Sequence, residues 1–333
     1  MRIAVRVLMI IGWITAGAVC LYAQENPLNQ RLKITSTVPK GLLAGRSFVF
    51  YQAQFTDEQL KEIQSYFQKT GIDAVGYFSE DLVFASREVS KIIVDYLNKR
   101  EVDFIVLLDR TGKEFAITFV PFNRTYEFVN RDEGAWRSTG ADLTEVLETI
   151  YRTAINDQPR KNHLINDFPE RDFNLDFIPG RRSDFFAIDL KVDKLAVPWF
   201  EEAGKDSLLV ELFKTHYPYK YDMVNPGQLG KADLRKAGFH YVMEYVYTTG
   251  EVAQEILEYT VVPSGKSALV SVTYPEGVLK LKTISAQAPV YKFYFKHIES
   301  GNIFLGTKWD ADLSWDEALV NHLKGFKAEL KIP

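Results

Sequence analysis

The segment Ser264-Gly265-Lys266-Ser267 is the first candidate for chemistry, because it matches the end of a phosphate-binding loop. Such a loop needs a glycine five positions before Gly265 and a helix directly after it, since backbone N–H groups at the helix start bind the phosphates. The required position is Thr260, and Pro263 precedes a predicted strand. The segment therefore predicts a hairpin turn, and we expect no nucleotide there.

The histidines do not predict a metal site. None of the five lies three or four residues from another, which is the spacing that places two ligands on one face of a helix. His240 falls in a predicted central strand, where a hydrogen-bonded core residue is the simpler interpretation, and His216 is expected at the surface. We expect neither a metal nor another cofactor. The five positions are His163, His216, His240, His297 and His322.

No motif marks a catalytic nucleophile or a catalytic carboxylate pair. The chain contains no Gly-x-Ser-x-Gly sequence, which would place a serine on a sharp turn. Acidic pairs such as Asp184 with Asp189, and Glu201 with Glu202, would suit a glycosidase, which needs two carboxylates at a defined separation. With 44 acidic residues in the chain, however, such pairs arise by chance. We assign no catalytic residue, and we expect binding rather than catalysis.

Two aromatic clusters, at residues 217–221 and 291–296, are candidates for a binding surface, since aromatic faces can stack on sugar rings. Residues alternate between the two faces of a strand, so the odd positions of the second cluster are expected in the core. If this strand lies at a sheet edge, its unpaired backbone groups invite a partner strand, and its lysines select an acidic neighbour. The simpler alternative is that the lysines only solvate a covered edge. The predicted outward surface consists of Lys292, Tyr294 and Lys296.

The start of the chain predicts export. Arg2 and Arg6 precede an apolar run at residues 7–19 and a small residue, Ala23, which is the order of a cleaved secretory signal peptide. The run is short for a transmembrane helix. Cys20 is the only cysteine, and the residues before it lack the usual lipoprotein pattern, so we expect cleavage after Ala23 rather than acylation. The mature chain would then have no thiol and no transmembrane segment.

Composition excludes some classes of partner and favours two domains. The predicted leader carries two of the 40 basic residues and no acidic one, so its removal moves the net charge from -4 to -6. That acidity does not favour nucleic acid as a partner. A mature chain of about 310 residues exceeds the usual size of a single core, and 46% of the residues are hydrophobic.

Periodic apolar residues predict an α/β chain made of two related units. The first unit reads strand, helix, strand, helix, strand, hairpin, helix, with helix starts at Thr56, Ser86 and Asp142. In the second unit we expect a strand at residues 185–190, an interrupted helical region at 192–213, a short helix at 229–237 and a strand at 239–247. A last helix follows the capping box formed by Ser314 and Glu317.

Short segments recur in the same order in the two halves, which predicts a duplication. The paired segments are residues 46–50 with 182–186, 103–106 with 240–243, and 141–144 with 311–314. Three prolines between residues 156 and 180 indicate an extended connector whose apolar residues, Leu164 among them, lie against a domain. The predicted organisation is a signal peptide at 1–23, an N-terminal segment at 24–44, a first α/β domain at 45–155, a connector at 156–180 and a larger second α/β domain at 181–333.

Two segments of the second unit carry a resemblance to a known domain. Residues 234–243 (LRKAGFHYVM) resemble a helix-to-strand segment, and residues 299–304 (ESGNIF) are similar to a hairpin before the last helix. Both belong to the periplasmic α/β domain shared by the curli-secretion lipoprotein CsgG, the amino-terminal domain of TolB and some lipoprotein activators of penicillin-binding proteins. The resemblance implies that fold, in tandem, and a role in the cell envelope.

These observations predict an exported, non-enzymatic binding or adapter protein of the bacterial cell envelope, located in the periplasm or at the outer membrane, or secreted. Its partner would be an envelope protein or polymer, or a second copy of the chain. The alternatives are an extracytoplasmic hydrolase that acts on glycans or peptides through unidentified carboxylates, and a structural assembly element. Charged and aromatic residues gathered in one concave pocket would favour the enzyme, and exposed sheet edges would favour the binding protein.

We expect the exported protein to begin at Gln24 or Glu25 and to carry no acyl group, because cleavage after Ala23 removes Cys20. Intact-mass spectrometry of the exported chain measures both properties. A mature chain that begins at an acylated Cys20 would contradict this prediction and place the protein on a membrane.

Overall fold

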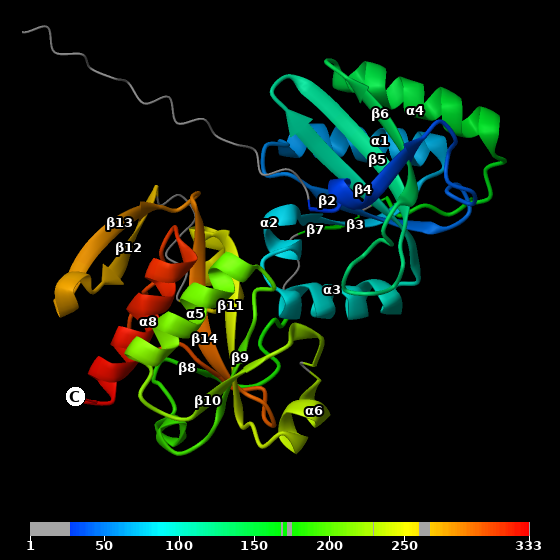
Figure 1. Ribbon diagram of the computed structural model, residues 1–333. Helices are drawn as coiled ribbons and strands as arrows, with labels where there is room; N and C mark the ends of the chain where they lie inside the picture. The colour runs from blue at the N-terminus through cyan, green and yellow to red at the C-terminus, as the bar shows by residue number, and fades with distance from the viewer. Residues whose placement is uncertain (1–26, 168, 172–174, 229, 260–266, 333) are drawn as a thin grey trace, which may run out of the picture.

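The computed structural model describes residues 27–167, 169–171, 175–228, 230–259 and 267–332 (Figure 1). The predicted signal peptide with Cys20 lies outside these residues, and so does the predicted turn at Gly265 and Lys266. The described chain is a mixed α/β protein, as the sequence predicts, and it contains one sheet of seven strands and one of six.

The first unit is built on the seven-stranded sheet, in the order β1-β6-β5-β4-β2-β3-β7. Strands β1 and β6, β2 and β4, β2 and β3, and β3 and β7 are parallel, whereas β4–β5 and β5–β6 are antiparallel. Its elements are β1 (Leu32–Thr35), β2 (Arg46–Tyr51), α1 (Asp57–Thr70), β3 (Asp73–Ser79), α2 (Glu80–Val83), α3 (Arg87–Lys99), β4 (Val102–Thr111), β5 (Glu114–Pro121), β6 (Glu133–Gly140), α4 (Leu143–Asp157) and β7 (Glu170–Arg171).

The second unit is built on the six-stranded sheet, in the order β10-β9-β11-β14-β15-β8, and on a separate two-stranded sheet, β12-β13. Its elements are β8 (Arg182–Ser183), β9 (Leu195–Pro198), α5 (Ala203–His216), β10 (Tyr221–Val224), α6 (Lys231–Lys236), β11 (Tyr241–Thr249), α7 (Gly250–Ile256), β12 (Ala268–Thr273), β13 (Lys280–Ser285), β14 (Pro289–His297), β15 (Ile303–Phe304) and α8 (Trp315–Glu329).

The two sheets share one topology. The order β8-β15-β14-β11-β9-β10 repeats β1-β6-β5-β4-β2-β3, with the same sequence of parallel and antiparallel pairs. The second unit differs by α7 and the hairpin β12–β13, which are inserted between β11 and β14. The predicted pairing of residues 46–50 with 182–186 is wrong in register, because 46–51 form β2, whose counterpart is β9, whereas β8 is the counterpart of β1.

The helix starts of the first unit are confirmed. Thr56 and Gln59 form a capping box on α1, Ser86 accepts a hydrogen bond from the N–H of Val89, and Asp142 accepts one from the N–H of Glu145. Gly71 ends α1 with a positive φ of 100°, a conformation that favours glycine.

Predictions for the second unit are less accurate. Residues 185–190 do not form a strand, because Phe186 turns into the core beside α8 and a 3-10 helix covers Ile188–Lys191. The expected helical region at 192–213 contains the strand β9 before α5. Ser314 precedes α8, but its side chain makes no capping hydrogen bond.

The segment expected to connect the units also takes part in the first sheet. Glu170 and Arg171 form β7 at the edge of that sheet, and Phe177 packs against a buried cluster. The expectation that Leu164 lies against a domain is wrong, since its side chain is 93% exposed.

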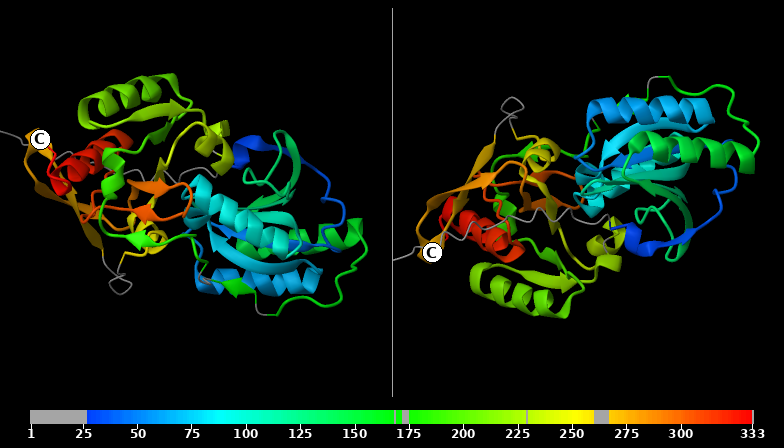
Figure 2. Two further views of the ribbon diagram at one scale, coloured as in Figure 1. Left: turned by 90° about the horizontal axis from the view of Figure 1, so that it is seen from below. Right: turned by 90° about the horizontal axis from the view of Figure 1, so that it is seen from above.

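One hydrophobic cluster joins the two units. It includes Val83 and Val89 from the first unit and Val246 and Tyr294 from the second. Helices α2 and α3 lie on the side of the first sheet that faces the second unit, in all three views (Figures 1 and 2). The first unit therefore covers part of the faces of β11 and β14 that point away from α5 and α8, beside α7, whose Ala253 and Ile256 belong to the same cluster.

This packing overturns the expected outward surface on β14. Lys292 is 0% exposed and Tyr294 is also buried, so neither points to water. The first unit covers Tyr294, and the segment between β15 and α8 covers Lys292. Lys296 is half-buried and forms an ion pair with Glu88 of α3. The odd positions of β14 do lie in the core beside α5 and α8, as the alternation predicts.

Lys292 belongs to a buried polar cluster instead. Its Nζ lies 2.8 Å from Oδ1 of Asp310 and donates to the carbonyl groups of Phe293 and Leu305, at 2.9 Å each. Nδ1 of His322 lies 3.1 Å from Oδ2 of Asp310. Burial lowers the pKa of both Lys292 and His322; it also opposes the charge of Asp310, but Lys292 holds the pKa of that carboxyl below its usual value.

We expect Asp310→Ala to lower the free energy of unfolding by about 3–5 kcal/mol, because it leaves Lys292 buried without its counter-charge. Replacement of both charges, Lys292→Met with Asp310→Leu, should cost less than Asp310→Ala alone. As a control, Glu148→Ala in the exposed pair with Arg152 should change stability by less than about 1 kcal/mol. Urea unfolding measures all three, and a small effect of Asp310→Ala would contradict the prediction.

Candidate functional site

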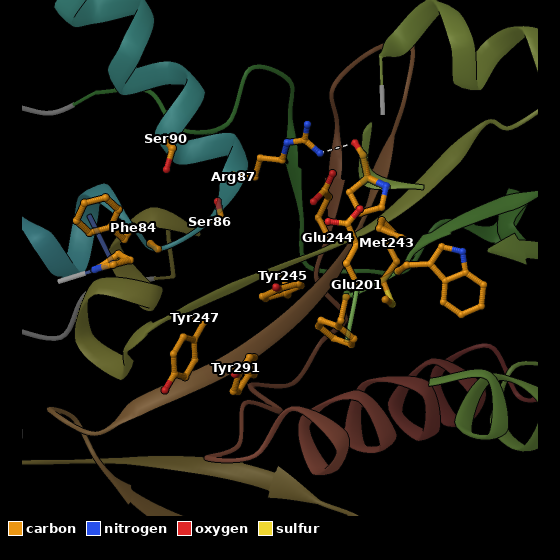
Figure 3. Close-up of a pocket in the computed structure, with 16 residues that line it drawn as sticks. Phe84, Ser86, Arg87, Ser90, Glu201, Met243, Glu244, Tyr245, Tyr247 and Tyr291 are labelled. Carbon is orange, nitrogen blue, oxygen red and sulfur yellow. Dashed lines mark hydrogen bonds between the residues drawn. The ribbon is translucent and has the colours of Figure 1, made fainter. Parts of the chain in front are cut away.

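A cavity of about 470 Å³ lies between the two units (Figure 3). Its walls come from the start of α3, the segments after β9 and β10, the middle of β11 and the start of β14. This volume falls in the range of small-molecule and peptide side-chain sites.

The strand order explains why a crevice forms here. After β9, the chain forms α5 and β10 on one side of β9 and then crosses to form β11 on the other side. In α/β sheets, ligands bind at such a switch point, outside the carboxyl ends of the strands. Trp199, Phe200 and Glu201 follow β9 directly, and Pro226 follows β10, so the loops that line the cavity are those at the switch point.

The length of β9 leaves the crevice open. Strands β9 and β11 pair only at Tyr241 with Leu195 and at Val242 with Ala196, although β11 continues to Thr249. Beyond that point the two strands are no longer paired, and the cavity lies alongside β11.

An aromatic wall lines one side of the cavity. Tyr245 and Tyr291 have ring centroids 5.9 Å apart, Tyr247 stacks on Tyr291 at 4.1 Å, and Phe200 lies 5.7 Å from Tyr245. Figure 3 shows the three tyrosines beside one another along β11 and β14. These rings are half-buried, and a tyrosine ring offers apolar surface together with a polar hydroxyl group.

A carboxylate without a partner faces the other side of β11. Glu244 is half-buried, and in the described parts of the chain its carboxylate makes no hydrogen bond or ion pair. Burial raises the pKa of Glu244 to about 7, and the nearby charge of Glu88 adds to this effect. Glu88 itself is held by Lys296 and by Lys91 at 2.8 Å; burial opposes its charge, but these lysines lower the pKa of Glu88 to about 2.

Arg87 closes the cavity from the first unit. Its Nη1 donates to the carbonyl of Pro226, and its guanidinium lies 4.8 Å from the ring centre of Tyr126. Figure 3 shows Arg87 and Glu244 at the same end of the cavity. Arg87 thus holds the two units together at the rim. Its charge, with those of Lys296 and Lys91, favours ionised Glu244 but does not outweigh burial.

A second cavity, of about 400 Å³, adjoins the first at Glu244, which lines both. Its other charged residues form pairs with each other: Glu88 with Lys91 and Lys296, and Lys231 with Glu299 at 3.1 Å. The two cavities give an inter-unit groove that is aromatic at one end and charged at the other.

The corresponding switch point of the first unit, at the end of β2, has a different character. There Gln52 donates to Asp109 at 3.4 Å, Asn29 donates to Asp109 at 3.2 Å, and Arg137 donates to Asn29. These polar side chains satisfy one another. The site of the second unit therefore differs by its aromatic lining and its unpartnered carboxylate.

The structure brings together few of the residues considered from sequence. Glu201 lines the cavity, but Glu202 bonds Lys205 and Asp184 pairs with Arg182. Of the predicted surface, Lys296 lines the second cavity, and Lys292 and Tyr294 line neither. Sequence reasoning missed Glu244, although a charged residue inside an apolar strand was a usable signal.

Comparisons with known proteins give no match: no family model, curated protein or solved structure matches this chain. The resemblance to the CsgG and TolB domain therefore stays a prediction. Within the described residues, no group of three or more His, Cys, Asp or Glu side chains could hold a metal ion. None of the helices described there has the length and apolar character needed to cross a membrane.

We expect Glu244→Gln to stabilise the protein above pH 7. The raised pKa means that the folded state holds the Glu244 proton more tightly than the unfolded state, so stability is lost as pH rises from about 4.5 to 7. Gln cannot ionise, so the variant should gain roughly 1–3 kcal/mol relative to the parent across this range. Urea unfolding between pH 4.5 and 8 measures the difference.

The exposed residue Glu114 provides the control, since Glu114→Gln should show no such pH-dependent gain. A Glu244→Gln variant whose stability runs parallel to that of the parent at every pH would contradict the predicted protonation of Glu244.

Proposed function

We propose that this chain is an exported, non-enzymatic binding protein of the bacterial cell envelope, and that it holds its ligand in the inter-unit cavity. The observation that carries the proposal is the combination of an aromatic wall and an unpartnered carboxylate at a topological switch point. Stacking on Tyr245 and Tyr291 would supply apolar contact, and Glu244 would orient a polar group of the ligand.

The location in this proposal comes from the sequence. The charged start, the apolar run at residues 7–19 and Ala23 support export to the periplasm or outer membrane, or secretion. The ligand is accordingly an envelope protein or polymer, and a second copy of the chain is the other candidate partner.

Two observations favour the hydrolase as a second candidate. The first is that charged and aromatic residues gather in one concave cavity, which is the arrangement expected of the enzyme. The second is that Glu244 and Glu88 lie close together with pKa values of about 7 and about 2, and such separated values are typical of an acid and an ionised partner in glycoside hydrolysis. Against this, two lysines already hold Glu88, so it is not free to act as a nucleophile or base. Binding is therefore the function that the arrangement supports better.

We expect the exported protein to retain soluble peptidoglycan fragments or peptides from a tryptic digest of envelope proteins, and to release them unchanged in mass. Tyr245→Ala removes the centre of the aromatic wall and should weaken retention at least tenfold, whereas Phe185→Ala, at an exposed aromatic residue outside the cavity, should not. Equilibrium dialysis with mass spectrometry measures affinity and turnover together.

If the protein releases shortened products and the Glu244→Gln variant does not, the protein is a hydrolase and the proposed binding function is wrong. If Tyr245→Ala leaves retention of the ligand unchanged, the cavity is not the binding site.

A further inference from the structure

The edge of β11 that borders the cavity lacks a neighbouring strand over several residues. Pairing with β9 ends at Val242, and the next position of β9 that could donate to β11 is Pro198, which has no backbone N–H. The next backbone hydrogen bond given for this edge is at Tyr247, whose N–H donates to the carbonyl of Ala85 at 2.7 Å. Proline thus ends the sheet at this position and leaves a gap as long as a short strand.

Strand geometry identifies the backbone groups in this gap. Tyr241 and Tyr247 both direct their N–H groups to the β9 side, toward Lys194 and Ala85, so the odd residues of β11 face that side. The C=O of Met243 and both polar groups of Tyr245 therefore point toward the cavity. The C=O of Met243 lacks the donor that a residue other than proline would supply at position 198, and β11 has no registered pair with β9 beyond Val242. Backbone groups of this kind normally find a partner.

The side chains around the gap indicate what kind of strand would fill it. The charged residues that line this cavity are Arg87, whose guanidinium contacts Pro226 and Tyr126, and the two carboxylates Glu201 and Glu244. Neither carboxylate has an ion-pair partner among the described residues. A basic side chain would complement them, and an apolar side chain on the opposite face of the added strand would pack on the aromatic wall.

We propose that the cavity binds an extended basic peptide, which adds as a strand to β11 between Met243 and Tyr247 and places a lysine or arginine at Glu244. This inference rests on the proposed function and names its ligand class. The backbone hydrogen bonds give affinity for an extended chain, and the alternating contacts with Glu244 and the aromatic wall give selectivity.

The test uses the peptide Ac-Val-Lys-Val-Lys-Val-NH2, a version with glutamine in place of lysine, and a version N-methylated at the central valine. The exported chain should bind the parent peptide at least tenfold more tightly than either other peptide. The parent peptide should also slow hydrogen exchange of the Tyr245 amide. Glu244→Gln should abolish the preference for lysine over glutamine.

Two proline variants test whether the open edge of β11, rather than the cavity alone, contributes to peptide binding. Pro198→Ala supplies an N–H that can bond the C=O of Met243 and extend β9, so it should weaken the parent peptide several-fold; Pro275→Ala, at an exposed proline outside the site, should not. Equal affinity for the N-methylated peptide, or for the glutamine peptide, would overturn the proposal. Binding of peptidoglycan fragments without peptide binding overturns it and leaves the proposed function standing, whereas loss of both kinds of binding defeats both.

Discussion

The site depends on the hydrophobic core that the two units share. Val83 and Val89 of the first unit pack with Val246 and Tyr294 of the second, and full burial of such a side chain contributes about 1.5–3 kcal/mol. This packing fixes the start of α3 beside β11, where Ala85 bonds Tyr247 and Arg87 reaches Pro226. Without it, one face of the second sheet would meet water, and Glu244 would be an ordinary exposed carboxylate with an ordinary pKa.

The shared core also explains why the predicted outward surface failed. Alternation along β14 tells which residues share a face, and the odd positions do pack beside α5 and α8. Alternation does not tell whether the second face is covered. Lysines at positions 292 and 296 predict a strand with one face in water. In the structure, however, Lys292 forms an ion pair with Asp310, and Lys296 forms one with Glu88. Ion pairs between residues far apart in the chain cannot be predicted from a single sequence.

Local signals predict the first unit well and the second unit poorly for the same physical reason. The helices α1, α3 and α4 begin at capping residues whose hydrogen bonds are local, so Thr56, Ser86 and Asp142 mark them in the sequence. Strand β9 has only four residues and depends on neighbours that come later in the chain, β10 and β11. The inserted α7 and β12–β13 also shift the spacing between the repeats, so the relation between the units is clearer from strand order than from sequence offsets.

The candidate site combines residues far apart in sequence, from the start of α3 to β14, which is why no motif announces it. The charge properties of the site follow from the different surroundings of two neighbouring carboxylates, Glu88 and Glu244. Glu88 has two lysines and stays ionised, so it contributes to the contact between the units. Glu244 has no such partner, and burial of an unpaired carboxylate costs free energy in the unliganded protein. A ligand that donates to Glu244 removes this cost on binding, just as a strand on β11 would satisfy the backbone groups that Pro198 leaves open. Both unmet requirements belong to the same cavity, and a single extended ligand with a basic side chain meets both of them.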